Sequence, residues 1–330
     1  MSAVLITGGA GYIGSHAVLA FQEAGFPVVV LDDLSTGRRS AVPDDVPLVE
    51  GSVGDAALVD RVLADHDVGA VVHFAGSIIV PESVDNPLLY YANNTAASRV
   101  LIERCIAAGV RHLLFSSTAA VYGMPRTVPI PETCACAPIN PYGRSKLMTE
   151  MMLRDAHAAH GLIYGALRYF NVAGADPQLR TGQVSRRATH LIKIASQVVT
   201  GQRDFIQVYG DDYDTPDGTC IRDYVHVSDL AEAHVQALRH MRAENTPLIL
   251  NCGYGRGYSV REVLDTVQAV AGRRIDIRQG PRRPGDPPTL VADPSALRRR
   301  LGWTPRHDDL EVIVRTALDW EAACTTTRAA

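Results

Sequence analysis

Short apolar runs alternate with longer amphipathic stretches through the first half of the chain. The short runs are rich in valine, isoleucine and leucine and read as strands; they lie at 3–7, 27–33, 46–51, 68–76, 110–118 and 162–174. Helix-like patterns lie between them, at 11–25, 54–66, 87–108 and 141–160. Apolar strands separated by helices are typical of a parallel sheet that is buried on both faces. The pattern therefore predicts an α/β fold with a doubly wound parallel sheet, in which ligands bind beyond the carboxyl ends of the strands.

The pattern loosens after about residue 175. Loops rich in glycine, proline and aspartate, such as 210–220 and 280–289, separate shorter elements there. We expect a larger domain over residues 1–175 and a smaller C-terminal region over 176–330. Later segments near 223–253, including the apolar run 247–253, are expected to return to the larger domain.

A glycine-rich turn, "ITGGAGYIGSH", joins the first predicted strand to the first predicted helix. Gly8, Gly11 and Gly14 satisfy the spacing G-x-x-G-x-x-G. Such glycines let the backbone approach a pyrophosphate, and the helix N-terminus that follows supplies N–H groups to it. Asp32 ends the second strand, where a carboxylate binds the ribose hydroxyls of adenosine and repels a 2′-phosphate. The larger domain is therefore predicted to be a Rossmann domain that binds NAD rather than NADP.

Tyr142 and Lys146 lie at i and i+4 of the predicted helix 141–160, on one face of it. The fifth strand ends with the hydroxyls of Ser116, Ser117 and Thr118, at the edge of the sheet where a ligand is expected. A phenol titrates near pH 10, and a nearby ammonium group favours its ionised form. With Thr118 sharing the proton, Tyr142 would be a general base. The alternative, a solvated helix face, is disfavoured by the glycine turn and the strand-end hydroxyls.

Composition narrows the classes of partner. The chain of 330 residues has 46% hydrophobic and 21% charged residues and a formal net charge of −4, which gives no electrostatic reason to expect a nucleic-acid or membrane partner. No apolar run approaches the ~18 residues of a membrane span, and the N-terminus shows no signal peptide, so we expect a cytoplasmic protein. The six cysteines lack the spacing of a metal site and are expected to be reduced thiols, with no metal bound.

Several longer motifs resemble the extended short-chain dehydrogenase/reductase superfamily and, within it, the UDP-glucose (UDP-galactose) 4-epimerases. They include "LDDLSTG", "YYANNT", "FSSTAAVYG", "NPYGRSK", "RYFNVAGA" and "RRPGDPP". The segment "GDDYDTPDGTCIRDYVHV" is the most specific of them, and the resemblance extends over nearly the whole chain.

The resemblance implies that Tyr142, assisted by Thr118, removes the proton from the sugar 4-hydroxyl while hydride passes from C4 to NAD. The 4-keto sugar would then turn over and be reduced on its other face. It also implies a homodimer formed by the helices near 87–108 and 141–160.

The resemblance also implies which residues form the sites. The catalytic residues would be Tyr142, Lys146 and Thr118. The cofactor would contact Gly8, Gly11, Tyr12, Ile13, Gly14, Asp32, Ser52, Val53, Phe74, Ala75, Gly76, Asn93, Ser116, Tyr142, Lys146 and Tyr169. The UDP-sugar would contact Thr118, Tyr142, Asn171, His190, Leu191, Gln207, Tyr209, Arg222, Arg283 and Asp286.

Three positions depart from the pattern of many relatives. Ser52 stands where an aspartate contacts the adenine, and Ile78 stands where a lysine lies near the cofactor phosphates. Thr289 is expected to stand where some relatives have a tyrosine that walls the sugar pocket. A smaller wall would admit a 2-acetamido group, so activity on UDP-N-acetylhexosamines is also predicted.

Other functions remain open at this point. A 4,6-dehydratase would need an acid–base pair after the fifth-strand serines, where this chain has Ala119 and Ala120. A UDP-pentose or UDP-uronate 4-epimerase would use the same catalytic residues. A non-catalytic NAD-dependent regulator on the same fold would more often have lost the tyrosine or the lysine.

Overall fold

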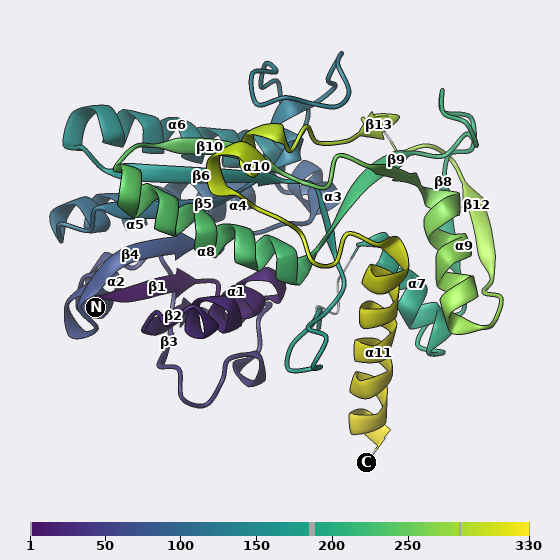
Figure 1. Ribbon diagram of the computed structural model, residues 1–330, viewed down its shortest axis with the longest axis horizontal. Helices are drawn as coiled ribbons and strands as arrows, with labels where there is room; N and C mark the ends of the chain where they lie inside the picture. Colours follow the sequence, from purple (N-terminus) through teal and green to yellow (C-terminus); the bar gives the residue numbers. More distant parts are fainter. Residues whose placement is uncertain (1, 185–188, 284, 330) are drawn as a thin grey trace.

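The computed structural model describes residues 2–184, 189–283 and 285–329 and contains one large parallel sheet (Figure 1). Its seven strands lie in the order β10-β6-β5-β4-β1-β2-β3. Their bounds are β1 Ala3–Thr7, β2 Val28–Asp32, β3 Leu48–Glu50, β4 Val68–His73, β5 His112–Thr118, β6 Ile163–Tyr169 and β10 Leu248–Cys252. All six pairings are parallel, and the strand order reverses between β1 and β4. The predicted doubly wound fold is confirmed.

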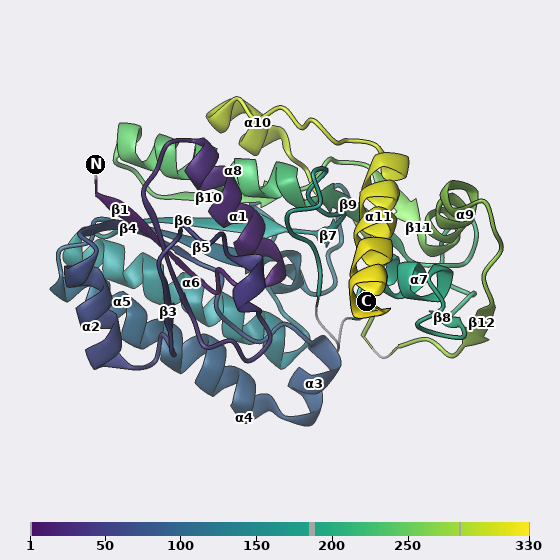
Figure 2. The same ribbon diagram turned by 90° about the horizontal axis from the view of Figure 1, so that it is seen from below.

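Helices cover both faces of this sheet (Figure 2). On one side lie α1 (Tyr12–Glu23) and α8 (Val227–Glu244), and on the other lie α2 (Ala56–Asp65), α5 (Ala97–Ala107) and α6 (Pro141–His160). Alternate residues of each strand enter two separate cores: Ile6 and Val30 belong to one, and Leu5 and Val29 belong to the other. Because successive strand side chains point to opposite faces, a continuous apolar run is what a strand covered on both faces requires.

The stretch predicted as one helix over 87–108 is divided. It consists of α4 (Pro87–Tyr90), the π-helical turn η2 (Tyr91–Ala96) and α5, and it follows the short helix α3 (Val80–Asp85). Within η2 the Asn94 side chain turns inward, where Oδ1 accepts from Ser77 N at 2.7 Å and Nδ2 donates to Ser145 Oγ at 3.1 Å. The prediction of a regular α-helix is wrong in this turn, because the wider winding accommodates an asparagine that ties the loop after β4 to α6.

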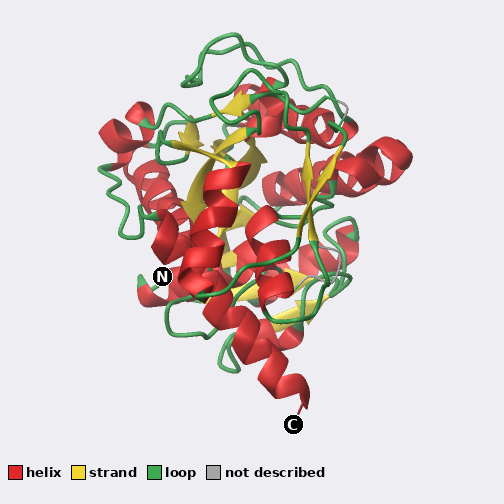
Figure 3. Cartoon of the chain, turned by 90° about the vertical axis from the view of Figure 1, so that its right-hand side faces the viewer, coloured by secondary structure: helices red, strands yellow, loops and turns green. Residues whose placement is uncertain are grey.

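The rest of the chain forms a smaller region beside the carboxyl ends of the large sheet (Figure 1). In one small sheet the central strand β9 (Ile221–His226) pairs with β7 (Asn171–Ala173), β11 (Gly257–Ser259) and β13 (Thr289–Leu290), and in another β8 (Ile206–Tyr209) pairs with β12 (Ile277–Gly280). The helices of this region are α7 (Leu191–Val199), α9 (Val260–Ala271) and α11 (Leu310–Ala329). Elsewhere lie α10 (Ser295–Leu301) and the two short 3₁₀ turns η1 (Arg39–Ala41) and η3 (Ala119–Tyr122). Figure 3 shows the helices, in red, around the strands, with the C-terminal helix extending away from the large sheet.

Three segments of the second half belong to the large sheet or pack on it. Strand β10, from the run 247–253, pairs with β6 at the sheet edge, and α8 packs on α1 and the sheet. Helix α10 also packs on α8 and β10, which the sequence pattern did not indicate. In the described part of the chain no helix is both long enough and apolar enough to cross a membrane.

Candidate active site

A cavity of about 2170 Å³ runs along the carboxyl ends of the large sheet and into the smaller region. All of the residues predicted to contact cofactor or substrate line this cavity, with the exception of Lys146. The structure therefore brings together residues that the sequence spreads from Gly8 to Asp286. It places Lys146 just behind the cavity wall, with Nζ 3.9 Å from the position that a Cβ of Gly76 would take.

The glycine turn between β1 and α1 is closed so tightly that side chains are excluded. A Cβ at Gly14 would lie 2.1 Å from the Gly8 carbonyl oxygen, and one at Gly8 would lie 2.6 Å from the Ala75 nitrogen. Helix α1 begins here, and its N-cap residue Gly11 supplies no capping side chain. A helix N-terminus without such a cap presents its N–H groups and positive dipole end to an anion. The cradle thus fits a diphosphate.

Asp32 is buried at the end of β2, where both carboxylate oxygens accept backbone hydrogen bonds. Oδ2 accepts from Ala10 N at 2.9 Å and Oδ1 from Leu34 N at 2.8 Å. Burial raises the pKa of Asp32, and these two bonds oppose the shift. Asp32 therefore also ties the glycine turn to the segment that follows β2, while it lines the cavity where a ribose would lie.

The loops after β3 and β4 complete this end of the cavity. Ser52 and Val53 line it, and so do Phe74 to Gly76. Asn93 of η2 donates from Nδ2 to Ser77 Oγ at 2.9 Å, which holds the loop after β4 against the helix. Ile78 is an exposed lining residue, so this position contributes apolar surface and no cation.

Helix α6 places Tyr142 in the wall of the cavity. The Asn140 side chain caps the helix by accepting from Gly143 N at 2.8 Å, Pro141 occupies the first turn, and Gly161 ends the helix in the left-handed conformation. Tyr142 is buried, and its hydroxyl lies near that of Thr118, which favours the ionised phenol. Because α6 starts at a fixed residue, the phenol reaches the end of β5 in a fixed position.

Lys146 is buried one turn further along α6. Nζ donates to the Ser116 carbonyl oxygen at 2.9 Å and lies 4.8 Å from the centre of the Phe115 ring. Burial lowers the pKa of Lys146 to about 8. Burial also raises the pKa of Tyr142. Burial thus acts against ionisation of the phenol, and the neighbouring Thr118 hydroxyl acts in its favour.

A buried ion pair lies behind Lys146 that the sequence analysis missed. Glu150 follows Lys146 by one more turn on the same face of α6 and accepts from Arg168 Nη2 of β6 at 2.6 Å. Ser117 Oγ also donates to Glu150, and Arg168 Nη1 donates to the Tyr122 hydroxyl at 3.0 Å. The signal available in the sequence was a charged residue within each of two largely apolar stretches, Glu150 in "MTEMML" and Arg168 in "GALRYF". The pair anchors α6 to β5 and β6, and its Ser117 partner directly precedes Thr118.

The other end of the cavity lies in the smaller region and carries the arginines. Arg222 Nη2 of β9 donates to Asp286 Oδ1 at 2.8 Å, so these two residues, both predicted to contact the UDP-sugar, are paired with one another. The Arg283 guanidinium stacks on the Tyr209 ring at 3.9 Å from its centre. The other residues predicted on the uridine side, His190, Leu191 and Gln207, line the cavity as well. This end offers positive charge and an aromatic face to a nucleoside diphosphate.

The prediction that Thr289 forms the wall of the sugar pocket is wrong by one position. Thr289 and Leu290 form β13 and pair with Ile221 and Arg222. Neighbouring residues of a strand point to opposite faces, and it is Leu290, not Thr289, that lines the cavity and packs in the cluster of Phe170 and Ile130. A branched aliphatic side chain therefore forms this wall.

Comparisons with known proteins agree with this geometry. The model of the family "NAD dependent epimerase/dehydratase family" matches residues 4–253. A UDP-glucose 4-epimerase of Azospirillum brasilense is 62% identical over 318 residues, which cover 96% of this chain and 91% of that protein.

Two solved structures are similar over nearly their whole length. The crystal structure of UDP-glucose 4-epimerase from Brucella ovis in complex with NAD has a TM-score of 0.95 at 44% identity and covers 98% of this chain and 99% of its own. The UDP-Glc/GlcNAc 4-epimerase of Campylobacter jejuni has a TM-score of 0.86 at 47% identity, with coverage of 98% and 100%.

Proposed function

Since the chain belongs to the NAD dependent epimerase/dehydratase family, we propose that it interconverts UDP-glucose and UDP-galactose by inverting C4 of the sugar, with NAD as its cofactor. One observation carries this proposal: a single cavity joins the glycine turn, the Tyr142–Thr118 pair and the arginines of the smaller region. A cofactor, a proton acceptor and a nucleoside diphosphate would thus meet in one space.

The division of the chain follows the two ends of this cavity. Residues 1–175 would hold NAD, and residues 176–330 would mainly hold the UDP-sugar, with segments near 223–253 returning to the NAD-binding domain. The glycine cradle and Asp32 support NAD at the first end. Bound there, NAD would supply the hydride acceptor and donor for C4.

Tyr142 would take the proton from the C4 hydroxyl and later return it, with Thr118 sharing the hydrogen bond. Ionisation of a buried phenol needs positive charge nearby, and protonated Lys146, four residues along the same helix face, would supply part of it. Because the two faces of the sugar must be presented in turn, the sugar end of the cavity must let a 4-keto intermediate rotate. The small residues Ala119 and Ala120, which line it after β5, leave room for this and provide no acid for dehydration.

At the other end, Arg222 and Arg283 would neutralise the diphosphate, and Asp286 would bind a ribose hydroxyl. His190 and Leu191 would line the uridine side together with Gln207 and Tyr209. The sugar wall at Leu290 is smaller than a tyrosine, which supports activity on UDP-N-acetylhexosamines as well.

A homodimer is the proposed assembly. The helices α4, α5 and α6 lie on one side of the molecule, and large apolar side chains are exposed on α4 and α6, among them Leu88, Leu89, Met148 and Met151. An apolar groove lined by Tyr91, Met148 and Met152 lies along the same side. Burial of such a patch against a second copy would remove it from water. A cytoplasmic location stays a prediction, and so does the reduced state of the cysteines.

The test is direct conversion of UDP-galactose. Purified protein is incubated with UDP-galactose, and UDP-glucose is followed with a coupled dehydrogenase. We expect turnover by the wild type and a loss of about 10²–10⁴-fold in Tyr142→Phe, which lacks the proton acceptor. No conversion by protein that demonstrably carries NAD would refute the proposal. Parallel assays with UDP-pentoses and UDP-uronates decide between this activity and its nearest alternatives.

A further inference from the structure

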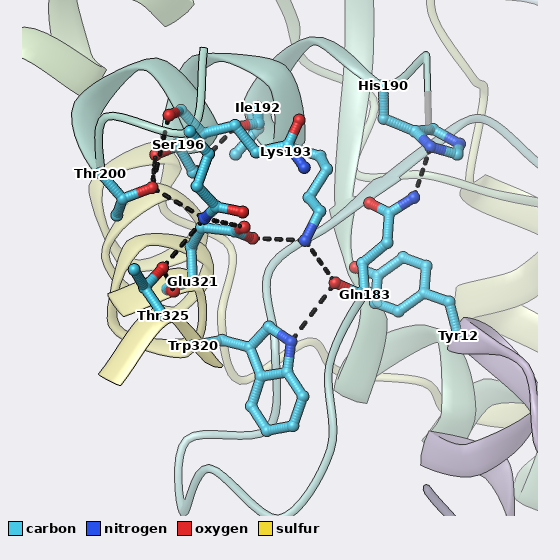
Figure 4. A network of polar contacts seen from close by, with 12 residues as sticks. Tyr12, Gln183, His190, Ile192, Lys193, Ser196, Thr200, Trp320, Glu321 and Thr325 are labelled. Carbon is cyan, nitrogen blue, oxygen red and sulfur yellow. Dashed lines mark hydrogen bonds and ion pairs between the residues drawn. The ribbon is translucent and has the colours of Figure 1, made fainter. Parts of the chain in front are cut away.

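A buried ion pair joins the C-terminal helix to the wall of the cavity (Figure 4). Lys193 of α7 and Glu321 of α11 are 8% and 3% exposed, and their charged groups form an ion pair. Lys193 Nζ also donates to the main-chain oxygen of Gln183 at 2.6 Å. The pair therefore does more than join two helices, because its lysine holds a residue that lines the cavity.

Helix α11 contacts the same short segment in two other ways. The indole nitrogen of Trp320 donates to the Gln183 oxygen at 3.3 Å. Gly182 packs so closely on the Trp320 ring that a Cβ would lie 2.5 Å from it. On the other side, Thr181 Oγ1 and Ser15 Oγ of α1 are 2.7 Å apart. Residues 181–183 are thus held between the helix of the glycine turn and the C-terminal helix.

The Gln183 side chain carries this constraint to His190. Its Nε2 lies 2.7 Å from His190 Nδ1 (Figure 4). With the Gln183 amide oriented so that Nε2 faces the ring, this N–H group donates and Nδ1 accepts, which assigns the proton of the neutral imidazole to Nε2. Burial lowers the pKa of His190, which also favours the neutral ring. Both Gln183 and His190 line the cavity, so the ring is fixed as an Nε2–H donor at its wall.

We propose that Glu321 and Lys193 are positioning residues for substrate binding, which act through Gln183 to fix the orientation and the Nε2–H tautomer of His190. This inference rests on the proposed function in that the ligand of His190 is taken to be the UDP part of the substrate. We call the set Glu321, Lys193 and Gln183 the brace. His190 would contact the ligand, and the brace would act only through it.

Stability alone does not account for the brace. A buried ion pair is weak support for a fold, because desolvation offsets the attraction, and apolar residues of similar volume often serve as well. Here the lysine is aimed at one carbonyl oxygen of a cavity residue, and the glutamate holds that lysine in place. Gln202 Nε2 in turn donates to Glu321 Oε1 at 2.6 Å, which fixes the carboxylate.

The test is a double-mutant cycle between the brace and His190, with UDP as the probe and NAD-loaded enzyme throughout. The brace is replaced by the apolar pair Lys193→Met/Glu321→Leu, which avoids leaving one charge unpaired. We expect the Kd of UDP to rise about five- to tenfold, the effect of losing one hydrogen bond, while kcat stays within about twofold of the wild type. His190→Ala is expected to raise the Kd similarly, and the combined variant to be no worse than His190→Ala.

The matched control is Glu311→Gln, which removes an exposed acid that pairs with Arg315 on the same helix. It is expected to leave the Kd unchanged. Where the double replacement does not fold, the isosteric Glu321→Gln is used, with a smaller rise expected. Additive effects of the brace and His190→Ala, or an unchanged Kd in the brace variant, would overturn the proposal.

A second readout does not depend on the ligand. Nitrogen-15 NMR of the imidazole should show Nδ1 of His190 without a proton in the wild type and a mixture of tautomers in the brace variant. A wild-type ring protonated on Nδ1 would overturn the proposal, whatever the affinity for UDP. Failure of the wild type to bind UDP or to convert UDP-galactose would instead count against the proposed function, and the NMR result would still decide on the brace.

Discussion

Replacing Glu150 by alanine removes one partner of the buried pair behind the catalytic helix. The side chains of Glu150 and Arg168 are 4% and 6% exposed, and Arg168 holds the carboxylate with Nη2 at 2.6 Å and Nε at 3.0 Å. The Ser117 hydroxyl donates to the same carboxylate. Glu150→Ala therefore leaves a guanidinium and a hydroxyl in the interior without their acceptor.

The expected cost is large because the remaining charge stays buried. Breaking a buried ion pair by removing one partner costs about 3–5 kcal/mol of the free energy of unfolding. An exposed pair on the neighbouring helix is the comparison: Arg99 and Glu103 are 60% and 50% exposed. Water screens such a pair, so it contributes little to stability. The structure thus predicts a much larger loss in Glu150→Ala than in Glu103→Ala.

Chemical unfolding with guanidinium chloride measures both, at one protein concentration and with the same NAD content, because bound ligands and subunit association shift apparent stability. The double variant Glu150→Leu/Arg168→Met should recover most of the loss, since it leaves no charge unpaired. A loss in Glu150→Ala as small as that in Glu103→Ala would refute this reasoning, because it would mean that water reaches the guanidinium.

Three further outcomes are expected. The pKa of Lys146 is lowered from 10.5 to about 8 in the folded protein, so the unfolded chain binds more protons between those two pH values. The free energy of unfolding should therefore rise with pH across this window more in the wild type than in Lys146→Met. Equal slopes in the two proteins would contradict the shift. Leu290→Tyr should lower activity on UDP-N-acetylglucosamine much more than on UDP-glucose, whereas Thr289→Tyr, which changes a residue outside the cavity lining, should not show this selectivity. Met148→Glu should convert a dimer to a monomer in light scattering, and an unchanged mass would place the subunit interface elsewhere.

The features that the sequence predicted are local ones. The alternation of strands and helices follows from apolar runs a few residues long, and the glycine turn follows from steric requirements within one strand–turn–helix unit. The start of α6 was predictable for the same reason, since Pro141 favours the first turn of a helix. Local chemistry decided these elements, so no knowledge of distant contacts was needed.

The features that the sequence left out are contacts between distant segments. Arg168 and Glu150 are 18 residues apart, Arg222 and Asp286 are 64 apart, and Lys193 and Glu321 are 128 apart. In each case the two residues come from different elements, and either one alone reads as an ordinary surface charge. The prediction of the residue that walls the sugar pocket failed for a related reason. A shift of one residue in a strand exchanges its two faces, and only the pairing of β13 with β9 fixes which face Leu290 occupies.

Tyr142 and Lys146 have one feature that the sequence predicts, their common helix face, and one that it does not, the contact of the lysine side chain. Spacing alone puts the two residues on one helix face, as the structure shows, but it says nothing about where a flexible side chain turns. Lys146 turns to the Ser116 carbonyl, and burial raises the pKa of Tyr142 and lowers that of Lys146. Both shifts oppose charge, because the cavity wall is poorly solvated. The same poor solvation strengthens the electrostatic effect on Tyr142 of any positive charge that a ligand brings to the wall. The phenol would therefore become a base when the site is filled and stay neutral otherwise.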